Sequence, residues 1–335
     1  MFQWHDQAWK SWRPLRGRLP HAILIQGAEG QGEFEFGRAA ALSLLCEKPL
    51  PDGRGCEACL ACNWLRQGNH PDFRLLVPES MAPESAAEDA EPARKEKRSE
   101  QIRIEQVREL SAFLAVGTHR AGLRVILLYP AEAMNPNTQN ALLKSLEEPP
   151  PGTVFLLVSS RPEGLLPTVR SRCMKFSLPL PDKAKALAWL KEQGIRRPEA
   201  ALAEAGGAPL AALRAVETES DRSRFLEGLR QPGFDPITLA DAAQRVPPWE
   251  LVGWLQRWGH DLLLARVSGR VRYYPDHEAA LGELSRRCEP AEIAAYLRGL
   301  AQARALARHP LNARLFVEDL LLRYRRLIAA AREGA

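Results

Sequence analysis

The chain has 335 residues, of which 45% are hydrophobic, so we expect two or three domains and exclude a disordered chain. Its 46 basic and 41 acidic residues leave a net charge of +5, which permits contact with nucleic acid without requiring it. No apolar run is long enough to span a bilayer and Met1–Lys10 holds no apolar signal segment, so we expect a soluble cytoplasmic protein.

The first half of the chain alternates short apolar runs with helical patterns. The runs predict four buried strands: Ala22–Gln26, Phe73–Val77, Val125–Leu128 and Val154–Val158. Helices are predicted at Phe36–Cys46, from Ile102 to Leu114, and at Asn137–Glu148, which prolines end. This alternation predicts an α/β domain with a parallel sheet.

The composition changes abruptly between Pro78 and Glu100. This stretch is rich in Pro, Ala, Glu, Lys, Arg and Ser, and Met81 is its only large apolar residue. It cannot bury enough apolar surface to offset the entropy lost on ordering, so we predict a mobile surface insertion at about 78–100.

After Pro179 the strands end and the chain becomes helical. Three short helices are predicted at Lys183–Glu192, Pro198–Ala205 and Pro209–Val216, before a longer all-α region that begins near Ser220. Trp249, Trp254 and Trp258 recur there at helical spacing, which is more typical of a core or a subunit interface than of a cofactor site. We therefore predict an α/β core at 1–178, a helical lid at 179–217 and a C-terminal helical domain at 218–335.

A glycine-rich segment follows the first predicted strand. Gly27, Gly30 and Gly32 lie in the sequence Gly-Ala-Glu-Gly-Gln-Gly-Glu-Phe, which has the glycine spacing of a P-loop, G-x-x-x-x-G-K-[ST]. Glu33 replaces the lysine and Phe34 replaces the hydroxyl residue that binds Mg²⁺. A carboxylate near a triphosphate costs several kcal/mol, so we predict that this loop does not support hydrolysis. An ordinary strand-to-helix turn is the alternative.

The strand that should carry the acidic Mg²⁺ ligands also lacks them. It ends in Tyr129 and Pro130, and the nearest carboxylate, Glu132, lies beyond the expected position. Two independent parts of an ATP-hydrolysing site are therefore missing.

Four cysteines have the spacing of a metal site. Cys46, Cys56, Cys59 and Cys62 form a C-x₉-C-x₂-C-x₂-C pattern, which predicts a closed, structural Zn²⁺ site in a module at about 46–66. An Fe–S cluster, a redox pair or chance thiols are the alternatives. Nearby cations and aromatic residues are few (Arg54, Arg66 and Trp64), which favours local stapling over nucleic-acid binding. Two further cysteines, Cys173 and Cys288, are predicted to be small buried apolar residues.

An arginine-containing segment, Thr168–Cys173, precedes the short run Lys175–Leu178 near a sheet edge. An arginine presented across a subunit boundary can stabilise the charge on a transferred phosphoryl group. A surface arginine paired with a carboxylate is the alternative.

Taken together, these motifs resemble a known family. The sequence Asn140-Ala-Leu-Leu-Lys-Ser-Leu-Glu-Glu-Pro-Pro150, followed by Ser171-Arg-Cys173, resembles the clamp-loader branch of the AAA+ family. The four-cysteine insertion narrows the resemblance to bacterial clamp-loader subunits, and the altered loop distinguishes the chain from the ATP-hydrolysing gamma/tau subunit. The resemblance runs from Trp4 to Asn312–Tyr324, nearly the whole chain.

The resemblance implies a fold and a role. The fold would be an AAA+ P-loop-type parallel sheet domain with a zinc-binding insertion, a small helical lid and a C-terminal helical collar. Zinc would bind Cys46, Cys56, Cys59 and Cys62, while Leu210 stands where an active motor has its sensor arginine. Arg172 would be an arginine finger that acts in trans on the neighbouring motor subunit.

The implied protein is a degenerate AAA+ ATPase without hydrolysis of its own, one subunit of the bacterial DNA polymerase III clamp loader. Its partners would be gamma/tau and delta subunits in a hetero-pentamer. It would contact the sliding clamp and primed DNA through that complex, and it would not bind a membrane. The rival hypotheses are a weak autonomous ATPase and a zinc-dependent nucleic-acid-binding protein.

Overall fold

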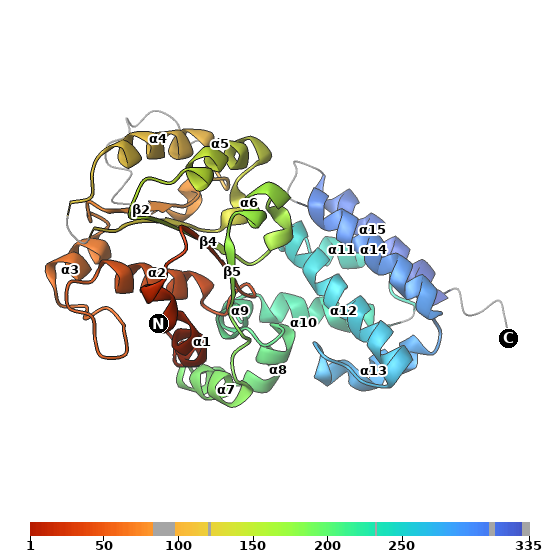
Figure 1. The fold of residues 1–335 in the computed structure, drawn as a ribbon. Coiled ribbons are helices and arrows are strands. Elements are labelled where there is room, and N and C mark those ends of the chain that lie inside the picture. Colours follow the sequence, from red (N-terminus) through yellow and green to blue (C-terminus); the bar gives the residue numbers. More distant parts are fainter. Residues whose placement is uncertain (83–97, 120–121, 232, 308–311, 330–335) are drawn as a thin grey trace. The chain divides into compact units, whose positions relative to one another are not determined.

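The computed structural model describes residues 1–82, 98–119, 122–231, 233–307 and 312–329 (Figure 1). The chain divides into two compact units, Met1–Asp182 and Lys183–Ala335. Most of the insertion predicted at 78–100 lies outside the described residues, and one of its flanks is a 3-10 helix at Glu79–Met81. Among the helices that are described, none is both long and apolar enough to cross a membrane.

A parallel five-stranded sheet forms the centre of the first unit. Its order is β2-β3-β4-β1-β5 and every strand pair is parallel. The strands are β1 (Ala22–Gln26), β2 (Phe73–Leu76), β3 (Arg124–Leu128), β4 (Thr153–Ser159) and β5 (Met174–Ser177). The four predicted strands are therefore confirmed, and β3 and β4 are buried along their whole length because helices cover both faces.

Helices cover the two faces of this sheet (Figure 1). The helices of the first unit are α1 (Asp6–Trp12), α2 (Glu33–Leu45), α3 (Leu60–Gln67), α4 (Ile104–Ala115), α5 (Pro136–Glu147) and α6 (Pro167–Ser171). Because side chains alternate along a strand, Ile23 and Ile25 of β1 pack with α1 and α2, whereas Leu24 packs with α4 and α5. Both faces of the sheet thus contribute to the hydrophobic core.

The second unit is helical, and no strand lies in its described residues. Its helices are α7 (Lys183–Glu192), α8 (Pro198–Glu204), α9 (Pro209–Ala215), α10 (Glu219–Leu229), α11 (Pro236–Ala242), α12 (Pro248–Ser268), α13 (Glu278–Ser285), α14 (Pro290–Leu306) and α15 (Ala313–Ala329). Helices α7, α8 and α9 share a small core of their own that contains Leu190 and Leu202. The predicted change from α/β to all-α is confirmed.

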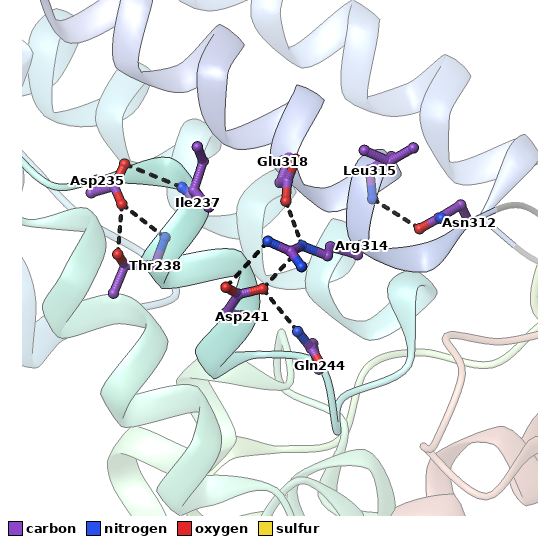
Figure 2. A network of polar contacts seen from close by, with 9 residues as sticks. All are labelled: Asp235, Ile237, Thr238, Asp241, Gln244, Asn312, Arg314, Leu315 and Glu318. Carbon is purple, nitrogen blue, oxygen red and sulfur yellow. Dashed lines mark hydrogen bonds and ion pairs between the residues drawn. The ribbon is translucent and has the colours of Figure 1, made fainter.

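The larger core of this unit is built on aromatic residues of α12. Trp254 and Trp258 are buried, and Trp258 Nε1 donates to the Tyr324 hydroxyl at 2.8 Å, whereas Trp249 is 43% exposed. Figure 2 shows a polar network that joins α11 to α15, in which Arg314 contacts Asp241 at 3.0 Å and Glu318 at 2.8 Å.

Candidate functional site

The glycine-rich segment Gly27–Gly32, here called the phosphate loop, connects the end of β1 to the start of α2. Gly30 and Gly32 have φ values of 84° and 88°, a left-handed conformation that favours glycine, and Gly32 is the N-cap of α2. A helix N-terminus of this kind suits an anion. The side chains around the loop therefore decide whether an anion can enter.

The carboxyl group of Glu33 turns back onto the loop. Its Oε1 accepts a hydrogen bond from the Tyr129 hydroxyl at 3.2 Å and a longer one from the Gly30 N–H at 3.5 Å. The side chain is 2% exposed, and burial raises the pKa of Glu33. An internal carboxyl thus occupies an N–H group that a P-loop would offer to a phosphate.

The two altered motifs meet in space. Phe34, which replaces the hydroxyl residue of the loop, stacks on Tyr129, the residue that follows β3, with ring centroids 4.7 Å apart. Burial also raises the pKa of Tyr129, so its hydroxyl stays protonated and can donate to Glu33. The sequence showed both departures but gave no sign of this contact.

The first residues of the chain lie over the phosphate loop. Phe2, Trp4 and His5 form what is here called the N-terminal cover. Trp4 Nε1 and His5 Nε2 donate to the Gln31 carbonyl at 2.8 and 3.0 Å. A Cβ on Gly32 would lie 2.6 Å from the Phe2 ring. Burial lowers the pKa of His5 to about 4, so its ring is neutral at pH 7.

The side chain of Gln31 fills the inner side of the loop. Its Nε2 donates to the Leu178 carbonyl at 3.4 Å, and a Cβ on Gly27 would lie only 2.3 Å from that nitrogen. The phosphate loop is therefore occupied from inside by Gln31 and covered from outside by aromatic residues. Sequence reasoning missed this arrangement because the cover carries no motif.

Glu132 is committed to a structural role. Its Oε1 accepts from the Ser160 N–H at 3.2 Å, the Ser160 hydroxyl at 2.8 Å and the Arg161 N–H at 3.1 Å. The side chain is 4% exposed. This carboxylate holds the turn after β4, which agrees with its displacement from the position of an Mg²⁺ ligand.

Arg172 lies at the C-terminal end of α6, immediately before the edge strand β5. Its guanidinium forms an ion pair with Glu147 and donates to the Thr168 carbonyl at 2.8 Å. The side chain is 33% exposed. The carboxylate pairing that was the alternative at this position is therefore present in the single chain. Leu210 lies in α9 of the second unit and is half-buried.

The structure brings the four cysteines together. Their sulfur atoms all lie within 4.8 Å of one another, and the Cys46–Cys59 and Cys56–Cys62 separations are both 3.9 Å. A tetrahedral ion with metal–sulfur bonds of about 2.3 Å requires sulfur atoms about 3.8 Å apart. The arrangement therefore fits a closed, four-coordinate metal site.

Backbone N–H groups support this cluster. The N–H of Cys56 donates to the Cys46 sulfur at 3.2 Å, that of Cys59 to the Cys56 sulfur at 3.3 Å, and that of Cys62 to the Cys59 sulfur at 3.5 Å. Burial raises the pKa of Cys46 and of Cys62, whereas N–H donors lower the pKa of Cys56 and, against burial, that of Cys59 to about 6. Such donors stabilise thiolates, the form that binds a metal.

The two cations beside the cluster are used within the chain. Arg54 pairs with Asp6 at 2.6 Å, and Arg66 donates to the Glu57 carbonyl at 2.9 Å. The remaining cysteines, Cys173 and Cys288, are buried apart from the cluster, as predicted. The surroundings of the four cysteines therefore favour a structural staple.

Comparison with known proteins gives consistent relatives. The family model described as DNA polymerase III, delta subunit, matches residues 8–182. The chain is 35% identical over 289 residues to DNA polymerase III subunit delta' of Pseudomonas aeruginosa, covering 83% of this chain and 79% of that protein. It is 29% identical over 318 residues to the subunit delta' of Escherichia coli, covering 92% and 89%.

Solved structures were matched at low identity. A DNA polymerase III gamma subunit-related protein of Thermotoga maritima matches with a TM-score of 0.44 and 19% identity, over 96% of this chain and 100% of that chain. The DNA clamp loader delta protein of Bacillus subtilis matches with a TM-score of 0.33 and 9% identity, over 95% and 99%.

Proposed function

The chain belongs to the family of DNA polymerase III delta' subunits, and on this premise we propose that it is a non-hydrolysing subunit of the bacterial clamp loader. In this role it helps the ATP-driven loading of the sliding clamp onto primed DNA. Its partners are gamma/tau and delta subunits in a hetero-pentamer, and its helical domain at 218–335 serves as the collar through which the subunits associate.

The observation that carries this proposal is the closed phosphate loop. Glu33 points its carboxyl at the loop, Gln31 fills it and Trp4 covers it. A triphosphate would have to displace all three and would meet a carboxyl group where a P-loop has a cation. The chain therefore has no hydrolytic cycle of its own, and nucleotide chemistry belongs to the neighbouring subunits.

Arg172 is the residue through which the chain contributes to that chemistry. It lies at the surface beside an edge strand, where a neighbouring subunit can approach. Its planar guanidinium would exchange the carboxylate of Glu147 for phosphate oxygens bound to the adjacent motor subunit. In the single chain the guanidinium is held by Glu147 and by the Thr168 carbonyl, and docking of the partner would release it from both.

The four cysteines would hold one Zn²⁺ with no open coordination position. The ion supplies cross-linking of residues 46–66 and takes no part in phosphoryl transfer. Its four ligands and the N–H donors between them belong to one local segment, so the module is a staple within the α/β core.

Reconstitution of the loader with gamma/tau and delta subunits tests the role of Arg172. The Arg172→Ala variant should assemble normally but lose DNA-stimulated ATP hydrolysis at the site it serves, where an arginine finger contributes about 10³–10⁵ in rate. Arg170→Ala, on the same helix, is the matched control. An ATPase rate unchanged by Arg172→Ala in an intact pentamer would remove the finger role.

A further inference from the structure

The segment that covers the phosphate loop continues directly into α1 and then into a 3-10 helix at Arg13–Gly17. Trp9 and Trp12 of α1 are buried against Phe36 of α2. The position of the N-terminal cover therefore depends on where this helical segment is held.

The same segment forms hydrogen bonds with the loop between the first two cysteines, Glu47–Gly55, here called the cysteine loop. Three side chains donate to its backbone carbonyls: Trp9 to Asp52 at 3.0 Å, Arg13 to Pro51 at 3.2 Å and Arg16 to Gly53 at 3.1 Å. These contacts join α1 and the 3-10 helix that follows it to the cysteine loop.

The cysteine loop is shaped by hydrogen bonds within it and by the cysteines that flank it. Inside it, the Leu50 N–H donates to the Arg54 carbonyl at 2.8 Å, and the Gly53 N–H donates to the Leu50 carbonyl at 2.8 Å. It is flanked by Cys46 and Cys56, which belong to the four-cysteine cluster. Binding of one ion by both residues closes the loop, and without the ion the loop regains conformational entropy.

Side chains fill only part of the space between α1 and the cluster. A cavity of about 270 Å³ lies between the start of the chain and the cluster, and Met1, Trp9 and Cys62 are among the residues that line it. The hydrogen bonds to the cysteine loop and the Asp6–Arg54 pair at 2.6 Å therefore connect the start of the chain to the cluster across this space.

We propose that metal binding by the four cysteines keeps the N-terminal cover over the phosphate loop. The ion fixes the cysteine loop, the cysteine loop restrains α1 in addition to its packing on Phe36, and α1 carries Trp4 and His5 onto Gln31. The metal centre is thus a brace for the closed state of the phosphate loop, and loss of the metal loosens the cover.

Hydrogen exchange of the full chain, resolved by peptide, tests this coupling. After removal of zinc with a chelator, peptides within residues 1–12 should exchange roughly tenfold faster or more, the change expected when about two ordinary hydrogen bonds are lost. Peptides from β3 and β4 should keep their protection. Unchanged exchange at residues 1–12 would overturn the proposal.

A second variant separates the coupling from general unfolding of the module. Arg13→Ala/Arg16→Ala keeps all four cysteines, so it should retain one equivalent of zinc and still show faster exchange at residues 1–12. Lys10→Ala/Arg18→Ala, which removes two exposed cations of the same segment, should leave the exchange unchanged. Full zinc content with unaltered exchange in Arg13→Ala/Arg16→Ala would also overturn the proposal.

Discussion

Replacing Gly32 with alanine should displace the N-terminal cover. With φ at 88°, alanine costs about 1–2 kcal/mol from backbone conformation alone. The new Cβ would lie 2.6 Å from the Phe2 ring and 2.9 Å from His5, so the cover must move. Loss of the hydrogen bonds from Trp4 and His5 adds about 0.5–1.5 kcal/mol each, which gives a total of about 2–5 kcal/mol.

Gly68 provides the control, because its φ is 78° and a Cβ added there would meet no atom within 4 Å. Gly68→Ala should therefore lower the free energy of unfolding only by the backbone strain of alanine, about 1–2 kcal/mol. The assay is urea unfolding of the full chain, with hydrogen exchange of β1 and β4 as the probe, so that the measured free energy is that of the first unit. Equal losses in the two variants, with unaltered exchange in the cover, would refute the packing of the cover on the loop.

Three further variants test buried charged groups. Burial raises the pKa of Glu33, so the free energy of unfolding of the wild type falls as pH rises above 4.5. The Glu33→Gln variant does not titrate at this position, so its stability relative to the wild type in urea unfolding should increase from acid to neutral pH. Burial lowers the pKa of His5 from 6.5 to about 4, so up to about 3 kcal/mol of folding stability from the neutral ring is lost as pH falls through that range. Hydrogen exchange of the N-terminal cover should therefore become faster in acid, and His5→Gln should abolish this acid dependence. Arg222 is 5% exposed and pairs with Glu204 at 2.7 Å, so Arg222→Ala should destabilise the second unit by about 3–5 kcal/mol in thermal unfolding, whereas removing the exposed Arg230–Glu227 pair should cost under about 1 kcal/mol.

Four of the five strands could be predicted from the sequence because each contains a run rich in apolar residues, whereas the edge strand β5 (Met-Lys-Phe-Ser) has no such run. Strands buried on both faces, such as β3 and β4, carry this signal in their own residues. The cysteine cluster could be predicted as well, because its four residues fall within one short segment and their spacing is typical of a metal site.

The contacts that close the phosphate loop could not be predicted in this way. Glu33 meets Tyr129, which is 96 positions away, and Trp4 meets Gln31, which is 27 away. Each residue looks unremarkable in its own neighbourhood, and only the folded sheet brings them together. The sequence could show that lysine and hydroxyl residues are missing, but it could not show what occupies their place.

Arg172 shows a different limit. Its motif indicated a surface arginine near a sheet edge, which the structure places at the end of α6 beside β5. The ion pair with Glu147 depends on the packing of α5 against α6, which no local pattern reports. A role toward a neighbouring subunit depends on an assembly, so its test requires the reconstituted loader.

Phosphate release by the purified chain with ATP and Mg²⁺ tests most directly whether this chain lacks ATP hydrolysis of its own and acts through its neighbours. We expect release at the background rate, equal for the wild type and Gly32→Val. Robust magnesium-dependent release that disappears in Gly32→Val would contradict this expectation.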